Sequence, residues 1–341
     1  AAPADTAAAA AAAASSHGAD AAAGGLSQED WDPLSACSAR ALRRRRPSSI
    51  CLRRLRGELA ALHTDPPPGM LTRADDEVAT LVHALLVGPA GTPYADGLFH
   101  FVIDAPDDYP LMPPRVRLLT TGGGAVRFNP QFYTCGRVCL SILHTWPGPG
   151  WQPSFTLRVV LLQLQALMNE LPALNEPRIM LMSDPEEYNT FLRHETLRVA
   201  VLGTAEEALA SVLAECGRPF TPLLGGQDIG PCAAEAAMLP IDLACAALRH
   251  LAATAADLEL RCRALAIAVP EGARLGGVPR PAVAQYSGMA AAMRRLPAAA
   301  ADAFAGLADT RGFAAGGATA LARPTSRDGG GPEVFLRRFS E

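Results

Sequence analysis

The sequence predicts a mixed α/β fold of the α+β kind, in which helices flank an antiparallel β-meander. Four stretches predict it. Residues 48–65 carry large apolar side chains at helical spacing. Residues 78–106 contain two apolar runs joined by the turn-rich segment GPAGTPYADG, which is typical of a hairpin. Residues 155–171 and 184–202 show the periodicity of amphipathic helices.

The first helix is expected to begin at a serine and to end before three prolines. The stretch SSICLRRLRGELAALHTDPPPG opens with serines, which are good helix caps. The prolines at 66–68 cannot continue a helix. We expect the buried stripe of this helix to comprise Ile50, Leu52, Leu55, Leu59 and Leu62.

The remaining elements of this region are short strands followed by helices. YPLMPPRVRLLTTGGG adds a third strand-like run, so a meander is expected. Prolines between positions 106 and 114 favour extended loops between the strands. The helix at 184–202 is expected to have Asp184 as its N-terminal cap.

The chain divides into four parts by composition. Residues 1–47 are rich in Ala, Gly and Ser and are expected to be disordered, because they can bury little apolar surface. Residues 48–202 form the folded core, 203–313 an alanine-rich helical extension, and 314–341 a loose tail. The arginine run at 43–46 fits a nuclear-import or acidic-partner patch and a solvated run before a helix equally well.

Charge and cysteine usage narrow the class of protein. The net charge of −4 gives no global attraction for nucleic acid or anionic membranes, and no apolar run is long enough to span a membrane. The 8 cysteines show no paired spacing, which favours reduced thiols and an intracellular, cytoplasmic protein; nuclear residence is left open. All 30 residues of the Lys+Arg count are arginines, which we attribute to coding bias.

The segment FNPQFYTCGRVCLSIL places two cysteines, Cys135 and Cys139, four residues apart. A zinc site needs about four ligands, and only His144 lies nearby, so no metal is expected. A disulfide is also disfavoured in a reduced chain. No histidine stands in a protease-like signature. A thiol can nonetheless accept an acyl group from another thioester, because that exchange is nearly balanced in energy.

Several motifs together resemble the ubiquitin-conjugating enzyme (E2) family. They are GPAGTPYADGLFHF, DYPLMPPRV, RFNPQFYTCGRVCLSIL, Trp151 with Pro153, and the NEP at 175–177, all in the order seen in that family. The resemblance covers residues 48–202 and implies that they form a UBC core domain. PPPGM, LNEP and RHET further resemble the long Z-type subgroup, which also carries a ubiquitin-like modifier of two tandem ubiquitin folds.

The resemblance assigns roles around the cysteines. Cys139 matches the thioester cysteine, and Cys135 falls at a variable position as a bystander. The family usually has His-Pro-Asn ahead of the cysteine; here Asn129 replaces the His, as in the subgroup, and Gln131 replaces the Asn that stabilises the oxyanion or holds a nearby loop. This second replacement fits either tolerated drift or slowed transfer to amines.

Two further positions near the family's cysteine are often acidic and orient the attacking lysine. Ser141 occupies the first of these positions, so that acidic side chain is absent from this sequence, as in the subgroup. Glu176, beside Asn175, matches the second and is the expected acidic gate. A surface acid next to a helix is the alternative reading of Glu176.

The resemblance also implies partners and an activity. Arg53, Arg54 and Arg56 match the surface that meets the activating enzyme, or form a solvated helix face. Two loops match those that bind a ligase, with residues Leu111, Met112, Trp151, Gln152 and Pro153; Trp151 could equally be loop core.

The implied reaction is acceptance of ubiquitin, or a ubiquitin-like modifier, on Cys139 and its transfer to a protein substrate or a ligase cysteine. No cofactor is expected, because the activating enzyme consumes the ATP. An impaired UBC-fold adaptor or ubiquitin-binding module is the first alternative, kept open by Gln131. A thiol hydrolase or redox protein is the second, disfavoured by the lack of a placed histidine or CxxC.

Overall fold

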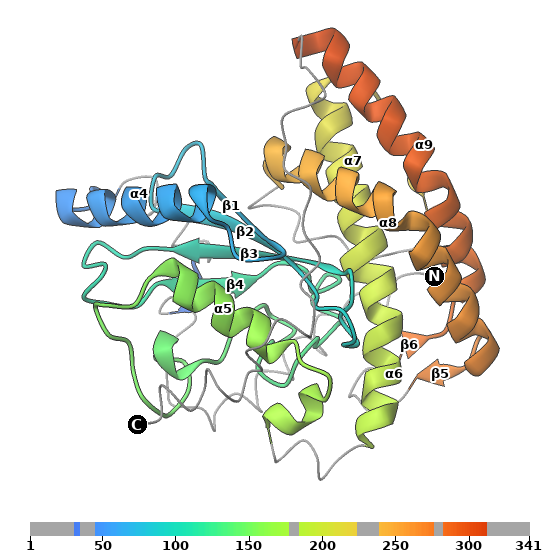
Figure 1. The fold of residues 1–341 in the computed structure, drawn as a ribbon, viewed down its shortest axis with the longest axis horizontal. Helices are drawn as coiled ribbons and strands as arrows, with labels where there is room; N and C mark the ends of the chain where they lie inside the picture. The colour runs from blue at the N-terminus through green and yellow to red at the C-terminus, as the bar shows by residue number, and fades with distance from the viewer. Residues whose placement is uncertain (1–30, 35–44, 177–183, 224–238, 276–281, 312–341) are drawn as a thin grey trace, which may run out of the picture.

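The computed structural model describes residues 31–34, 45–176, 184–223, 239–275 and 282–311 (Figure 1). A four-stranded sheet lies between helices α4 and α5 and a group of long helices formed by the second half of the chain. The N-terminal helix, antiparallel meander and following helices confirm the predicted α+β class. Most of segment 1–47 and the tail 314–341 lie outside the described residues, so the expectations for them stay predictions.

Helix α4 (Ser49–Thr64) begins where the sequence predicted. The Ser48 side chain accepts a hydrogen bond from the Cys51 N–H at 3.1 Å, which satisfies one of the free amides of the first turn. The predicted apolar stripe is partly wrong: Ile50 is 60% exposed, and the buried face contains Cys51 and Glu58 beside Leu55 and Leu62. A polar residue can take this place because Glu58 is fully engaged in hydrogen bonds, described below.

The sheet has the strand order β1-β2-β3-β4, with every pair antiparallel. The two central strands, β2 (Leu81–Val87) and β3 (Leu98–Asp104), are buried along their whole length, so both faces of the sheet are covered there. Strand β4 (Arg115–Leu118) is the outer strand that leads towards Cys139. Strand β1 (Met70–Ala74), directly after the triple proline, was missed by the sequence analysis, which expected three strands.

The β2–β3 hairpin contains the predicted turn segment and is fixed by close backbone contact. A Cβ atom at Gly88 would lie 1.9 Å from the carbonyl oxygen of Tyr94, so only glycine fits. The buried Tyr94 ring places its hydroxyl 2.6 Å from the carbonyl oxygen of Phe128, to which it donates. The hairpin therefore supports the segment that precedes the two cysteines.

The helices after the sheet follow the predicted order but differ in their limits. Helix α5 spans Leu157–Leu167, shorter than expected at both ends. Helix α6 (Pro185–Glu195) is capped by Asp184, as predicted, whose side chain accepts from the Glu186 N–H at 3.0 Å. It does not stop near 202: a π-helical segment, η5 (Thr196–Gly203), joins it to α7 (Thr204–Glu215), and Figure 1 shows one long helix beside the sheet.

The second half of the chain packs on the first through one continuous apolar core. Helix α8 (Ile241–Ala268) contacts β1 and α7, and α9 (Tyr286–Arg311) lies along α8, with the small strands β5 (Arg274–Leu275) and β6 (Ala282–Val283) between them. The buried cluster runs from Cys51 to Leu307. None of the described helices is both long and apolar enough to cross a membrane.

Buried polar contacts also connect the two halves of the chain. The Gln285 N–H donates to Nε2 of His194 at 3.3 Å, so Nδ1 carries the proton and donates to Glu195 at 2.7 Å. Both His194 and Glu195 are buried. Burial opposes ionisation of Glu195, but hydrogen bonds from His194 and Arg198 hold the pKa of this carboxyl below its usual value. The RHET stretch thus ties α6 to the segment before α9.

A second buried polar cluster lies within the sheet. Nδ1 of His83 is 3.0 Å from Nε2 of His100, and Nε2 of His83 is 3.3 Å from a carboxylate oxygen of Asp75. Burial, with a smaller contribution from His83, lowers the pKa of His100 to about 3. Burial also lowers the pKa of His83, against the effect of Asp75. Both imidazoles are therefore neutral at pH 7.

This cluster predicts a specific sensitivity to acid. The unfolded chain protonates His100 below about pH 6.5, whereas the folded chain does so only near pH 3, so stability falls as the pH falls through this window. The slope contributed by one such group is at most about 1.4 kcal/mol per pH unit. Urea unfolding of His100→Gln between pH 6.5 and 4.5 should show a flatter dependence. The exposed His63→Gln is the control; equal slopes in all three proteins would contradict the assignment.

Candidate active site

Cys139 lies at the end of the loop that follows β4. Its backbone N–H donates to the carbonyl oxygen of Gln131 at 2.9 Å; the Phe132–Val138 bridge folds the loop back on itself, and the Arg117–Arg137 bridge joins it to β4. Gly136 has φ 90°, and a Cβ atom there would lie 2.4 Å from the carbonyl oxygen of Leu118. Cys139 is 1% exposed, so a reactant reaches its sulfur only after the groups covering it move aside.

The structure separates the two cysteines of the motif. Cys135 is exposed at the tip of the loop, whereas Cys139 is buried, and neither forms a disulfide. His144 is not placed as a base for Cys139, because its Nε2 accepts the backbone N–H of Trp151 at 3.1 Å. Among the described residues, no group of three or more His, Cys, Asp or Glu side chains could hold a metal ion.

Tyr133 is the side chain near Cys139 that the sequence analysis missed. Burial, then the charge of the neighbouring Cys139, raises the pKa of this phenol to about 12. The phenol is therefore a proton donor at neutral pH. It lies six residues before the cysteine, a spacing visible in the sequence, but its orientation depends on the folded loop.

Asn129 is a buried structural residue of the site. It is 0% exposed, and its amide nitrogen donates to the carbonyl oxygen of Leu167 at 2.8 Å and to the Tyr94 hydroxyl at 3.0 Å. Its amide oxygen accepts the N–H of Gln131 at 3.0 Å. One side chain thus joins the cysteine loop to the end of α5 and to the β2–β3 hairpin.

Gln131 points its amide towards the loop that carries Glu176. Its nitrogen donates to the carbonyl oxygen of Asn175 at 3.2 Å; since a carbonyl can only accept, the amide oxygen must face elsewhere. That oxygen is buried and has no hydrogen-bond partner among the described residues. This geometry favours the loop-holding role of the two that the resemblance implies.

The expected acidic gate, Glu176, lies at the end of the same loop, after the short 3-10 helix η3 (Pro172–Asn175). One of its carboxylate oxygens is 3.9 Å from a terminal nitrogen of Arg127, and that oxygen is buried without a hydrogen-bond partner within the described chain. Ser141 begins the 3-10 helix η2 (Ser141–Leu143) directly after the cysteine. Buried polar atoms without partners are rare and often mark sites that receive a ligand.

The three arginines expected on the activating-enzyme surface do not share one environment. Arg53 and Arg56 are exposed on α4. Arg54 instead pairs with the buried Glu58 and donates to the carbonyl oxygen of Phe155 at 3.0 Å. Glu58 also accepts from the Tyr109 hydroxyl and the Leu157 N–H, each at 2.7 Å. Arg54 therefore helps to hold α4 against the start of α5.

The two loops expected to bind a ligase lie side by side. Leu111 is 71% and Met112 48% exposed, and Gln152 and Pro153 are also exposed. Trp151 is buried instead, and its indole N–H donates to the carbonyl oxygen of Pro110 at 2.7 Å. Trp151 thus joins the two loops, while the other four residues form their accessible surface.

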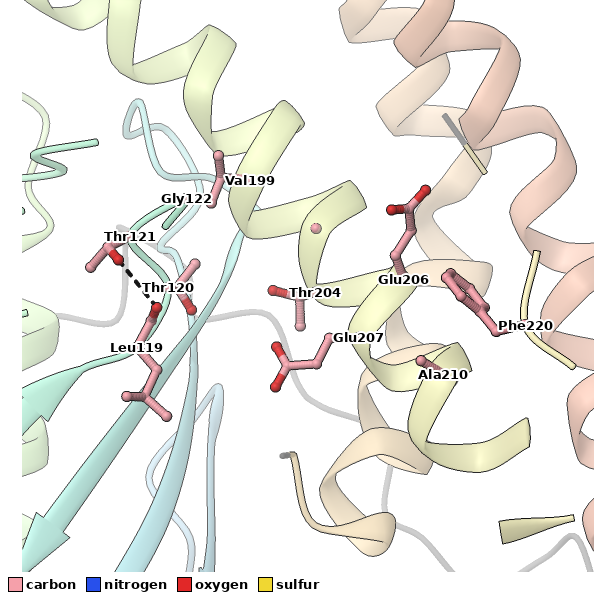
Figure 2. Close-up of a pocket in the computed structure, with 11 residues that line it drawn as sticks. Leu119, Thr120, Thr121, Gly122, Val199, Thr204, Glu206, Glu207, Ala210 and Phe220 are labelled. Carbon is pink, nitrogen blue, oxygen red and sulfur yellow. Dashed lines mark hydrogen bonds between the residues drawn. The ribbon is translucent and has the colours of Figure 1, made fainter. Parts of the chain in front are cut away.

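A separate cavity of about 240 Å³ lies between the end of β4 and helix α7. In Figure 2, Glu207 of α7 points towards Leu119 and Thr120 on the strand side, and Glu206 lies near Phe220 at the far edge. Neither cysteine of the motif lines it. The Thr204 hydroxyl donates to the carbonyl oxygen of Leu98 at 3.2 Å. The cavity therefore lies where the following helices pack on the sheet, apart from the candidate site at Cys139.

Comparison with known proteins identifies the class to which this fold and cysteine loop belong. Residues 54–195 match the family model described as ubiquitin-conjugating enzyme. The chain therefore contains a domain of the ubiquitin-conjugating enzyme family, as the motifs predicted.

Curated relatives agree with the predicted Z-type subgroup. The chain is 44% identical over 192 residues to ubiquitin-conjugating enzyme E2 Z of Xenopus tropicalis, 54% of this chain and 60% of the relative. It is 43% identical over 208 residues to the E2 Z protein of Danio rerio, 58% of this chain and 62% of the relative. With the Homo sapiens protein it shares 44% identity over 189 residues, 54% of this chain and 52% of the relative. The chain thus spans about half to three fifths of these relatives' length.

The buried position of Asn129 predicts a loss of stability rather than a direct loss of chemistry. Asn129→Ala leaves the Gln131 N–H without its partner and removes one of the two amide donors to the Leu167 carbonyl, which keeps that of Asn175; this should lower the free energy of unfolding by about 2 kcal/mol. Urea unfolding measures this change. Gln165→Ala, which removes an exposed amide-to-carbonyl bond, is the control and should change little. An Asn129→Ala protein as stable as the parent would show that the loop is anchored otherwise.

Proposed function

We propose that this chain accepts ubiquitin, or a ubiquitin-like modifier, from an activating enzyme as a thioester on Cys139 and transfers it to a protein substrate or a ligase cysteine. The observation that carries the proposal is that Gln131 joins the buried Cys139 to the loop of Glu176: its backbone carbonyl accepts the Cys139 N–H at 2.9 Å, and its side-chain amide donates to the Asn175 carbonyl at 3.2 Å. The family of the surrounding domain supports the same reaction.

The residues allow both half-reactions to be written in full. In charging, the Cys139 thiolate attacks the modifier's thioester carbonyl on the activating enzyme, whose own thiolate leaves. In transfer to lysine, the ammonium gives a proton to Glu176, and the neutral amine attacks the carbonyl carbon. The C–N bond forms, the C–S bond breaks, and the nitrogen gives its second proton to the departing sulfur, so Cys139 leaves as a thiol next to the phenol of Tyr133.

The tetrahedral intermediate of this transfer carries a negative oxygen that needs a hydrogen-bond donor. The Gln131 amide is already used on the Asn175 carbonyl, so its main role in this proposal is to hold the Glu176 loop near the sulfur. A carboxylate acts as a base only within hydrogen-bond reach of the proton it takes, which makes the position of this loop decisive.

Partners and compartment belong to the same proposal. Arg53 and Arg56 form the face offered to the activating enzyme, and Leu111, Met112, Gln152 and Pro153 the face offered to a ligase. Exposed apolar side chains in adjoining loops support the second assignment. No cofactor is assigned, since the activating enzyme consumes the ATP, and neither nucleic acid nor a membrane is assigned as a partner. We place the protein in the cytoplasm, with access to the nucleus.

Charging can be tested with the two cysteines of the motif. With activating enzyme, ubiquitin and ATP, the parent protein should give a thiol-sensitive adduct on a non-reducing gel. Cys135→Ser should keep this adduct, because Cys135 lies at the exposed loop tip. Cys139→Ser should lose it, because a hydroxyl is a weak nucleophile and forms at best a stable ester. An uncharged parent protein would favour the adaptor function, and loss of the adduct in Cys135→Ser alone would reverse the assignment.

The lack of lysine predicts the fate of the charged enzyme. All 30 basic residues of the Lys+Arg count are arginines, whose guanidinium groups stay protonated and cannot attack a thioester. The charged protein, incubated without substrate and with its N-terminal amine blocked, should form no hydroxylamine-resistant conjugate on a side chain. Peptide mass spectrometry measures this. An amide-linked modifier on any internal residue would contradict the prediction.

A further inference from the structure

Arg127 contacts both polar side chains that approach Cys139. Its guanidinium carbon lies 4.2 Å from the centre of the Tyr133 ring. A terminal nitrogen of the same group lies 3.9 Å from a carboxylate oxygen of Glu176. Tyr133 and Glu176 come from different loops, so this one cation connects the donor beside the sulfur with the carboxylate of the acidic gate.

Arg127 is itself firmly held. Its guanidinium donates to the carbonyl oxygen of Pro130 at 2.5 Å, and its backbone carbonyl accepts from the Tyr188 hydroxyl at 3.2 Å. The guanidinium thus lies between a phenol and a carboxylate. A cation over an aromatic face favours one ring position, and a cation beside a carboxylate favours one carboxylate position.

Within the described residues, the Arg127 side chain leaves one hydrogen-bond donor without a partner. Its Nε is buried without a partner among the described residues. The Glu176 oxygen that lies 3.9 Å from a terminal nitrogen of Arg127 is likewise buried without a partner. At 3.9 Å the ion pair attracts the carboxylate but forms no hydrogen bond, so the buried oxygen remains able to accept one. An amine attacking at Cys139 supplies the donor that this oxygen lacks.

We propose that Arg127 is a positioning residue, which holds the Tyr133 phenol against Cys139 and keeps the Glu176 carboxylate directed towards the attacking amine. This inference rests on the proposed function, since positioning matters only if Cys139 carries a thioester. It adds a residue to which the motif assigned no role. Arg127 acts through Tyr133 and Glu176 and does not touch the reacting atoms.

The proposal predicts a defect in transfer and not in charging. Arg127→Met keeps the length of the side chain but removes the charge and the planar group. Single-turnover discharge of the charged protein to free lysine should slow about tenfold, which corresponds to about 1.4 kcal/mol. The charging endpoint should be reached as in the parent protein. Arg193→Met on α6, which loses only an ion pair with the exposed Glu186, is the matched control and should discharge normally.

A mutant cycle separates positioning from a merely structural role. Because Arg127 acts through both Tyr133 and Glu176, Arg127→Met in a Tyr133→Phe/Glu176→Gln background should slow discharge by much less than tenfold, since both groups that it positions are already absent. If Arg127→Met still slows discharge tenfold in that background, Arg127 acts independently of both side chains and the proposal is wrong. Unchanged discharge in Arg127→Met would also overturn it.

A measurement that needs no activity completes the test. In protein labelled with ¹³C-tyrosine, the ring resonance lost in Tyr133→Phe identifies Tyr133. This resonance should move in Arg127→Met and stay in place in Arg193→Met; no movement in Arg127→Met would overturn the contact. If the parent protein fails to charge, the proposed function fails while this resonance still decides the contact. Arg127→Gln, which can still donate to the Pro130 carbonyl, provides the same readouts if Arg127→Met does not fold.

Discussion

The site depends first on the buried amide of Asn129. This side chain makes hydrogen bonds to the end of α5, to the β2–β3 hairpin and to the backbone of Gln131. A buried amide that loses such partners costs more than each bond contributes, so these contacts hold together as a set. The segment between Asn129 and Cys139 contains no helix or strand, and it needs an anchor of this kind to keep one conformation.

The other polar contacts of the site follow from that anchor. With Gln131 fixed, its amide reaches the Asn175 carbonyl, and together with the bonds of the Asn175 side chain to Asn169 and to the Leu167 carbonyl it holds the loop that ends at Glu176. The loop also places Tyr133 beside Cys139 and under the guanidinium of Arg127. The proposed nucleophile, a phenol, a carboxylate and a cation thus come from one loop and its neighbour. Such prior arrangement lowers the reorganisation that a transfer reaction requires.

The second half of the chain is structurally continuous with the family domain. Helices α7, α8 and α9 share the apolar core of the sheet, and the His194–Glu195 pair joins α6 to the segment before α9. The central strands are covered on both faces as a result. The extension therefore contributes to the stability of the domain that holds Cys139 and is not an independent appendage.

The sequence predicted the fold class, the family and the candidate cysteine because these depend on local patterns and motif order. It missed β1, since five residues after a triple proline give too short a pattern to indicate a strand. It placed Ile50 on the buried face, because a stripe of apolar letters cannot show that Glu58 is buried by its bonds to Tyr109 and Leu157. It also missed Tyr133 and Arg127, whose contact depends on how an irregular loop folds. Periodicity carries no information on such contacts.

The most direct test of the account is to locate the modifier on the unmodified parent sequence. After incubation with activating enzyme, ubiquitin and ATP, the protein is digested without reductant and the modified peptide is sequenced by mass spectrometry. The account predicts one thiol-labile acyl group, carried by Cys139. A modifier found on Cys135 or on another cysteine, with Cys139 unmodified, would contradict it.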